Sequence, residues 1–324
     1  MNRKAVLVAA LVCSALIGLG IYLFLRSPGP GGPMPYVKSI THEWGVVNEN
    51  VTEVRSCVVI CNPSPISAKL ESLEYEIYMN DIKMAEGSSV ETVDIPARGE
   101  AEVHLSTFID NSKIPSWWAS HVGNGEKTTT RIEGRAEVKI YGLTYEIPFS
   151  LQKEFETDFE EEADLTEPKE VEIADLRPLY KRVYVVIESV DTSWGEVSEE
   201  TTQLIHVAEI YNPNDFDIPV TSFRYRITAN EVILAEGEQP LELVVLEAGK
   251  TTTLRLYTYL DNTKLDDWWV SHINNGEKTY VKVEVYAAYR VQIPIIGVDI
   301  TVEKEVLVKE FTVETDILGE LTYP

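Results

Sequence analysis

The side chains best suited to chemistry in this 324-residue chain are its three cysteines and five histidines. Cys57 and Cys61 could act as nucleophiles or zinc ligands, but an extended segment would hold them roughly 13 Å apart, which is too far for a disulfide. His42, His104 and His206 lack a metal-ligand spacing such as HxxxH, and the sequence contains no glycine-rich phosphate loop or calcium loop. We therefore expect no catalytic residue, no metal ion and no cofactor.

The other two histidines, His121 and His272, lie in similar sequence contexts and could act as proton shuttles. No serine, cysteine or carboxylate is spaced to work with either of them. The sequence favours a hydrogen-bonded histidine, or one that interacts with the dipole at the C-terminal end of a helix, over a catalytic one.

These similar contexts come from an internal duplication of the chain. Shifting the sequence against itself by 150 residues, or by 151 in its later part, aligns the two halves. Cys57 and Cys61 then fall on Val207 and Tyr211, so we interpret both cysteines as small core hydrophobes that the duplicated fold does not need as thiols. The clearest matches are Trp44-Gly45 with Trp194-Gly195, Asn62-Pro63 with Asn212-Pro213, Ala85-Glu86-Gly87 with Ala235-Glu236-Gly237, and Trp117-Trp118 with Trp268-Trp269.

Most of each copy alternates apolar and more polar residues with a period of two. Leu73, Tyr75, Ile77 and Met79 form one such series. Similar runs, separated by Gly, Pro and Asn turns, give roughly six to eight short strands per copy. The pattern predicts a mainly β fold made of two tandem antiparallel β-sandwiches.

One segment in each copy has helical periodicity instead. Apolar residues and a histidine recur at i, i+3, i+4, i+7 and i+8, which predicts one amphipathic α-helix per copy. Asn111 or Ser112 could cap the first helix, and Gly125 suits the left-handed residue after its end. The helix positions are Ile114, Trp117, Trp118, His121 and Val122 in the first copy, and Leu265, Trp268, Trp269, His272 and Ile273 in the second.

The paired tryptophans of each helix could form a platform for a ligand. Adjacent residues on a helix point about 100° apart, so one tryptophan of each pair should pack on the sheet while the other lies at the edge of a groove. Because aromatic side chains bury large areas, core packing is the favoured role of both pairs. The candidate groove residues are Trp117, Trp118, His121, Trp268, Trp269 and His272.

An Asn-Pro pair follows an apolar strand in both copies. Proline cannot donate to a central ladder and asparagine folds its side chain onto nearby backbone, so each pair should end its strand in a turn, with a polar ligand contact as the alternative. Separately, Asn50-Val51-Thr52 is a glycosylation acceptor triplet, which matters only outside the cell. The turn residues are Asn62 and Pro63 in the first copy and Asn212, Pro213 and Asn214 in the second.

The N-terminal segment is expected to anchor the chain in a membrane. Residues from Ala5 to Leu25 carry no charge and would form a helix of roughly 31 Å, enough to cross the hydrocarbon core. A cleaved secretory signal is the alternative, but its apolar region normally spans only about 7–15 residues. Arg3 and Lys4 before the span, against Arg26 alone close behind it, place the N-terminus in the cytoplasm and the rest of this single-pass chain outside.

Composition sets the remaining boundaries and excludes one class of partner. An acidic stretch without a clear period separates the two copies. A formal net charge of −25 would repel phosphates, so no nucleic-acid partner is expected. We predict a transmembrane anchor at 1–26, a Pro/Gly tether at 27–35, a first sandwich at 36–159, an acidic linker at 160–178, a second sandwich at 179–317 and a tail at 318–324.

Both copies resemble the late embryogenesis abundant type 2 (LEA-2) family, also called the water stress and hypersensitive response (WHy) domain. The resemblance rests on the apolar strand that runs into Asn-Pro, on Tyr75 or Tyr225 in the next strand, and on the Glu-Gly step after it. Copy two keeps the fuller Asn-Pro-Asn pattern, whereas Ser64 takes the third place in copy one. The resemblance implies an immunoglobulin-like or fibronectin-like sandwich with one helix, no catalytic residues, and a non-enzymatic protective role in desiccation, heat or other stress.

Three functions are compatible with these features. The first is a membrane-anchored, outward-facing protein that binds and stabilises client proteins during water or heat stress, with a hydrated acidic surface and a limited apolar groove. The second is a carrier of a lipid or another apolar ligand, held between helix and sheet. The third is an adhesion or spacer module at the cell surface. The lack of a paired acid, base or nucleophile argues against an enzyme.

Overall fold

A computed structural model of the chain describes residues 35–157, 164–165, 167–178, 180–315 and 321–322. The predicted membrane span, from Ala5 to Leu25, lies outside these residues, as does nearly all of the predicted tether. Within the described part of the chain, no helix is long and apolar enough to cross a membrane.

The chain divides into two compact units by its internal contacts. The N-terminal unit comprises the described residues of 2–157, 269–278 and 314–324, and the C-terminal unit those of 158–268 and 279–313. Both units consist of antiparallel strands, so the predicted mainly β, antiparallel class is confirmed.

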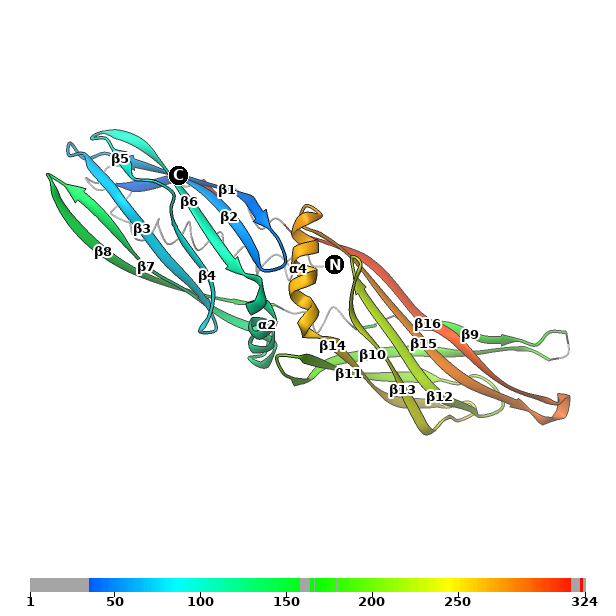
Figure 1. Cartoon of the computed structure of the whole chain (residues 1–324). Helices are drawn as coiled ribbons and strands as arrows, with labels where there is room; N and C mark the ends of the chain where they lie inside the picture. The colour runs from blue at the N-terminus through cyan, green and yellow to red at the C-terminus, as the bar shows by residue number, and fades with distance from the viewer. Residues whose placement is uncertain (1–34, 158–163, 166, 179, 316–320, 323–324) are drawn as a thin grey trace. The chain divides into compact units, whose positions relative to one another are not determined.

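The N-terminal unit contains one continuous sheet in the order β17-β1-β2-β6-β4-β3-β7-β8, with β5 paired to β3 (Figure 1). β4 joins its two halves because Ala85 pairs with Ile77 of β3 on one side and with Ile109 of β6 on the other. Two separate layers were expected, but this pairing makes the layers continuous. The strands are β1 (Tyr36–Val47), β2 (Val51–Asn62), β3 (Ala68–Met79), β4 (Ile82–Ser89), β5 (Val93–Ile95), β6 (Gly99–Asp110), β7 (Lys127–Ile140), β8 (Leu143–Glu156) and β17 (Leu321–Thr322).

Period-two alternation explains which face of these strands is buried. Val58, Ile77 and Leu105, from three different strands, are at most 1% exposed and fill the interior. The β3–β4 hairpin turns through Asn80 and Asp81, whose φ angles of 49° and 64° fit the tight turn that matches strand twist. The predicted tail contributes β17, in which Leu321 pairs with Ile40 of β1.

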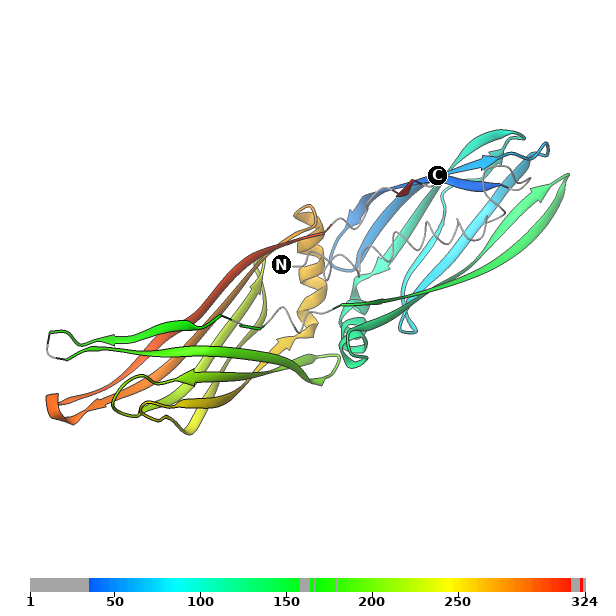
Figure 2. The same ribbon diagram turned by 180° about the vertical axis from the view of Figure 1, so that it is seen from behind.

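The C-terminal unit is built from two four-stranded sheets, β14-β11-β10-β9 and β13-β12-β15-β16. Figure 2 shows β9, β10 and β11 running alongside one another. Val185, Ile218 and Val291, drawn from both sheets, are fully buried in the shared core. The strands are β9 (Lys169–Asp175), β10 (Arg182–Val197), β11 (Thr201–Tyr211), β12 (Ile218–Ala229), β13 (Val232–Leu246), β14 (Thr251–Asp261), β15 (Lys278–Ile293) and β16 (Val298–Glu314).

Strand β9 lies inside the segment predicted as an acidic linker, 160–178. Lys169 pairs with Ile187 and Asp175 with Arg182, so this segment extends a sheet. Val171 and Ile173 are buried while Glu170 and Glu172 are exposed, which is the alternation of a strand with one face in the core. The high acidic content obscured this short period-two signal.

Each predicted helix is present: α2 spans Ile114–Gly123 and α4 spans Leu265–Asn274. A 3₁₀ turn precedes each one, η1 at Asn111–Lys113 and η2 at Asn262–Lys264. The capping differs from the prediction. The Asp110 side chain accepts a hydrogen bond from the Ser112 backbone N–H at 3.1 Å and so caps the 3₁₀ turn η1, whereas α2 itself follows Lys113 without a side-chain cap.

Candidate functional site

The first tryptophan of each predicted groove is bound to its own sheet. Trp117 Nε1 donates to Thr128 Oγ1 of β7 at 3.0 Å, and Trp268 Nε1 donates to Thr279 Oγ1 of β15 at 3.0 Å. Both indole rings are half-buried. A half-buried ring whose N–H is satisfied within the fold packs the helix onto the sheet.

His121 lies at the centre of a directed hydrogen-bond chain. Its ring is 1% exposed, with Nδ1 at 2.8 Å from Thr128 Oγ1 and Nε2 at 2.8 Å from Thr157 Oγ1. Thr157 donates its single O–H to Glu126 at 2.6 Å, so it must accept from the His121 Nε2–H. Thr128 accepts a hydrogen bond from Trp117 and donates one to His121 Nδ1, so both ring nitrogens of His121 have a partner.

The second copy repeats much of this arrangement. His272 is 2% exposed, its Nε2 lies 2.8 Å from Thr315 Oγ1, and Thr315 donates to Glu277 at 3.1 Å. Burial lowers the pKa of both His121 and His272 to about 4, so both rings are neutral at pH 7.

The geometry of the His121 chain is not that of a nucleophilic triad. In such a triad the histidine lies between the hydroxyl and the carboxylate, so that it can take the hydroxyl proton. Here the Thr157 hydroxyl lies between His121 and Glu126, and the His121 nitrogen that faces it carries a proton. Thr128, the other hydroxyl, is 1% exposed and out of reach of a substrate. These hydrogen bonds therefore connect the end of β8 to helix α2.

The second tryptophans occupy different surroundings from the first. The Trp118 ring centroid lies 6.3 Å from that of His121. Trp269, which belongs to the N-terminal unit by its contacts, donates to Thr52 Oγ1 at 3.0 Å and meets the Trp44 ring edge to face at 6.2 Å. Trp269 is thus held by aromatic and hydrogen-bond contacts within that unit.

The Asn-Pro residues have their asparagine side chains turned inward. Asn212 is fully buried; its Nδ2 donates to the Phe216 and Leu246 carbonyls at 2.9 and 2.8 Å, and its Oδ1 accepts from the Asn214 N–H. Asn214 also donates to the Tyr184 carbonyl at 2.7 Å. The residues hold the turn after β11 against the end of β13.

In the first copy the same place is taken by Asn62. It is 1% exposed and donates to the carbonyls of Ile66 and Pro96 at 2.9 and 3.1 Å. Its Oδ1 accepts from the N–H of Ser64, the residue that replaces Asn214. These contacts occupy the amide groups that a polar ligand would need.

Asn111 and Asn262 have a structural role that residue spacing alone did not reveal. Both are fully buried beside the helix starts. Asn111 accepts from the Thr52 hydroxyl at 3.0 Å and donates to the Asn48 carbonyl at 2.8 Å, and Asn262 does the same with Thr202 and Ser198. The repeated Asp-Asn step before each helix was the available signal.

The repeated glycines make room for side chains of neighbouring strands. A Cβ on Gly87 would meet the Tyr75 ring at 2.3 Å, and one on Gly237 would meet the Tyr225 hydroxyl at 2.7 Å. Each Tyr and Gly are direct cross-strand partners. The Tyr and Glu-Gly features of the resemblance are therefore one packing arrangement, with the buried Tyr75 hydroxyl 2.5 Å from Thr107.

The Trp-Gly repeat has a similar explanation. A Cβ on Gly45 would meet Glu53 at 2.2 Å, and one on Gly195 would meet Gln203 at 2.2 Å. Glu53 Oε2 accepts from the Val46 N–H and Arg55, and Oε1 accepts from Ser106. These hydrogen bonds lower the pKa of Glu53 to about 2, and the one from Arg55 has the largest effect.

The predicted glycosylation acceptor, Asn50, is exposed in the turn between β1 and β2, where its backbone N–H donates to Asn48 Oδ1 at 2.9 Å. The exposed side chain is accessible to a modifying enzyme.

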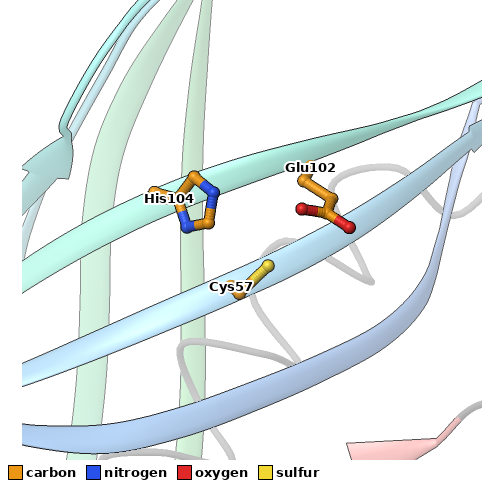
Figure 3. A group of neighbouring side chains, drawn as sticks. All are labelled: Cys57, Glu102 and His104. Atoms are coloured by element: carbon orange, nitrogen blue, oxygen red, sulfur yellow. The ribbon is translucent and has the colours of Figure 1, made fainter.

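A further group of side chains gathers on the exposed face of β2 and β6. Cys57, Glu102 and His104 each offer one ligand atom, and these atoms lie within 4.8 Å of one another (Figure 3). Burial, and secondarily the Glu102 charge, raise the pKa of the Cys57 thiol, so it is a poor nucleophile at neutral pH. The separation of Cys57 from His104 in sequence hid this group, because only the β2–β6 register brings them together.

Beside this group lies a hollow of about 680 Å³. Glu43, Arg55, Cys57 and His104 are among the residues that line it, together with His42. Burial lowers the pKa of His42 to about 4. The hollow is bordered by β1, β2 and β6 and does not involve the helix residues that were predicted to form a groove.

Comparison with known protein families gives a match in both copies. The sequence model of the Late embryogenesis abundant protein family (LEA_2) matches residues 58–153 and 207–306, more than half of the chain. The chain belongs to the late embryogenesis abundant protein family. The matches begin in β2 and β11 and end in β8 and β16, so they take in most of both repeats of this LEA protein. The resemblance seen in the sequence is confirmed, and membership indicates a stress-related role.

Two solved structures are similar to this LEA protein. A crystal structure of a protein from Archaeoglobus fulgidus is 28% identical and covers 43% of this chain and 98% of its own, with a TM-score of 0.33. A protein from Arabidopsis thaliana, solved in solution, is 14% identical and covers 41% of this chain and 78% of its own, with a TM-score of 0.26. Comparison with curated proteins finds no match.

Proposed function

We propose that this LEA protein is a non-enzymatic, stress-protective protein that binds and stabilises client proteins at a membrane. The observation that carries the proposal is the family match in both copies. The structure supports a binding role over a catalytic one, because the repeated polar residues, His121, Asn62 and Asn212 among them, are buried and hydrogen-bonded within the fold.

We propose that clients bind at the β7–β8 hairpin. Tyr141, Leu143 and Tyr145 are 81%, 62% and 48% exposed at or near its turn, and strand alternation puts Leu143 and Tyr145 on the same face of β8. Exposed apolar side chains that cluster in this way favour contact with another apolar surface. Clients that partly unfold during heat or drying expose such surfaces, while the acidic remainder keeps the complex soluble.

The hollow beside β1, β2 and β6 does not favour the alternative of a lipid carrier. Glu43, Arg55 and His104 line it, and an acyl chain would have to displace water from these charged and polar groups without replacing their hydrogen bonds.

The membrane location rests on the uncharged segment from Ala5 to Leu25. With the N-terminus in the cytoplasm, both sandwiches face outward. Protease added to intact cells should then digest the chain beyond residue 36, and full-length protein in the soluble fraction would contradict the anchor.

The client role is tested by heating an aggregation-prone enzyme with the purified full chain and following light scattering. The chain should suppress aggregation, and a Tyr141→Ser, Leu143→Ser, Tyr145→Ser triple variant should lose most of that effect. Tyr259→Ser is the matched control, because Tyr259 is 48% exposed but belongs to a different sheet. Equal suppression by the triple variant would remove the hairpin as the contact, and no suppression by the wild type would contradict client binding.

A further inference from the structure

We propose that Cys57, Glu102 and His104 form a binding site for one zinc-type divalent cation on the exposed face of β2 and β6. The site is independent of the proposed client contact at the β7–β8 hairpin.

The register of two strands creates the site. Cys57 and His104 are direct antiparallel partners, so their side chains project from the same face. Glu102 lies two residues before His104 and shares that face because successive strand residues alternate. Figure 3 shows the three side chains on these neighbouring strands.

The distances suit a small metal ion. The three ligand atoms lie within 4.8 Å of one another, and ligands around a tetrahedral zinc ion at about 2.0–2.3 Å stand roughly 3.5 Å apart. Small rotations of exposed side chains close this difference. Glu102 and His104 are exposed and Cys57 is half-buried, so no core side chain must move.

The donor set selects the class of cation. A thiolate, an imidazole and a carboxylate are the three ligand types that zinc takes in proteins, whereas calcium and magnesium prefer oxygen alone. Within the described residues, none of the three side chains has a hydrogen-bond or ion-pair partner, so no existing contact competes with a metal.

The surroundings give the cation access and a further ligand. Cys57 and His104 line the hollow of about 680 Å³, which leaves room for water as a fourth ligand. The net charge of −25 raises the concentration of cations near the surface.

The second copy shows that the fold does not require these residues. Val207 pairs with Arg255 in the register of Cys57 with His104, and Thr253 takes the place of Glu102. Strands β11 and β14 pair along their whole length without a single metal ligand at these positions. The ligand set is therefore an addition to the first copy and not a consequence of its packing.

The test uses the full chain, reduced and freed of metal, titrated with Co²⁺ as a spectroscopic substitute for zinc and then with Zn²⁺. One Co²⁺ per chain should bind with thiolate-to-cobalt charge-transfer absorption, and Zn²⁺ should displace it. Cys57→Val should abolish this absorption although Cys13 and Cys61 remain. His104→Arg and Glu102→Thr should each weaken binding beyond the roughly 10–100-fold typical of losing an outer-sphere partner.

The replacement residues are those that the second copy has at the equivalent positions, so the variants should fold. Equal unfolding temperatures of the metal-free variants and the metal-free wild type check this. Cys61→Val is the matched control and should leave absorption and affinity unchanged. The proposal is overturned if no stoichiometric binding occurs, if all three ligand variants bind as the wild type does, or if Cys61→Val removes the absorption.

Discussion

At the scale of single residues, the buried polar side chains have partners that lie near in space but at very different distances in sequence. Asn62 contacts Ser64 and Ile66, so its turn could be predicted from the residue types alone. His121 has one partner seven residues away and another, Thr157, on the far side of a hairpin. The second partner depends on the register of β7 and β8, which residue spacing does not contain.

Thr157→Val should show what this connection contributes to stability. The change removes a hydroxyl that joins His121 to Glu126, and it leaves the buried His121 Nε2–H without an acceptor. We expect a loss of about 1–3 kcal/mol in the free energy of unfolding, measured by chemical denaturation. Thr315→Val should have a similar effect in the second copy, and Thr129→Val, whose side chain is partly exposed, should have little. Unchanged stability in both Thr157→Val and Thr315→Val would show that these hydrogen bonds are dispensable.

Glu53 should make stability depend on pH in a defined window. Its folded pKa of about 2 lies below the ordinary 4.5, so its contribution is full above pH 4.5 and is lost as pH falls from 4.5 towards 2. Glu53→Gln introduces the residue type found at Gln203 and removes the titrating carboxylate. The variant should therefore lose about 1–2 kcal/mol less unfolding free energy than the wild type in that window. The difference is modest because the partner Arg55 is half-exposed. Glu49→Gln, in an exposed turn, is the control; an identical pH profile for wild type and Glu53→Gln would contradict the assignment.

The buried histidines act in a separate window. His121 and His272 have folded pKa values lowered to about 4 from 6.5, so stability falls as pH drops from 6.5 to 4 and is then constant with respect to these groups. The Glu53 effect can therefore be read below pH 4 without interference from them.

At the scale of elements, periodicity predicted most strands and both helices but missed the element with the weakest pattern. The helix from Ile114 to Gly123 follows from its i, i+3, i+4 spacing. Strand β9, Lys169–Asp175, has only Val171 and Ile173 as core residues among charges, so composition outweighed its alternation. The continuous sheet of the first unit could not be predicted either, since it depends on β4 pairing with both β3 and β6.

Gly87→Ala tests the packing of β3 against β4. The new Cβ would lie 2.3 Å from the buried Tyr75 ring, so the ring or the strand must shift. We expect a loss of about 1–3 kcal/mol in the free energy of unfolding. Gly123→Ala is the matched control because nothing lies within 4 Å of a Cβ there. Tyr75→Leu should restore part of the loss in the double variant, and equal stability of Gly87→Ala and wild type would show that β4 does not need this glycine.

At the scale of the whole molecule, duplication and charge are the properties that the sequence reveals most directly. The two copies of the LEA domain share several buried polar residues, such as Asn62 with Asn212 and His121 with His272, whereas other positions differ, such as Cys57 and Val207. The shared residues specify the fold, and the residues found in only one copy are where individual functions can be sought. The proposed membrane location rests on the uncharged N-terminal segment, and the expected lack of a nucleic-acid partner rests on the net charge of −25.

Recovery of a dried enzyme shows whether the full chain protects clients by binding them. A desiccation-sensitive enzyme is dried and rehydrated with the purified chain, with the β7–β8 triple variant, or with an equal mass of an unrelated acidic protein, and its remaining activity is measured. Protection that saturates near equal molar amounts of the wild-type chain, and that is lost in the variant, is the predicted result. Equal recovery with the wild-type chain and the unrelated acidic protein would contradict protection by specific client binding.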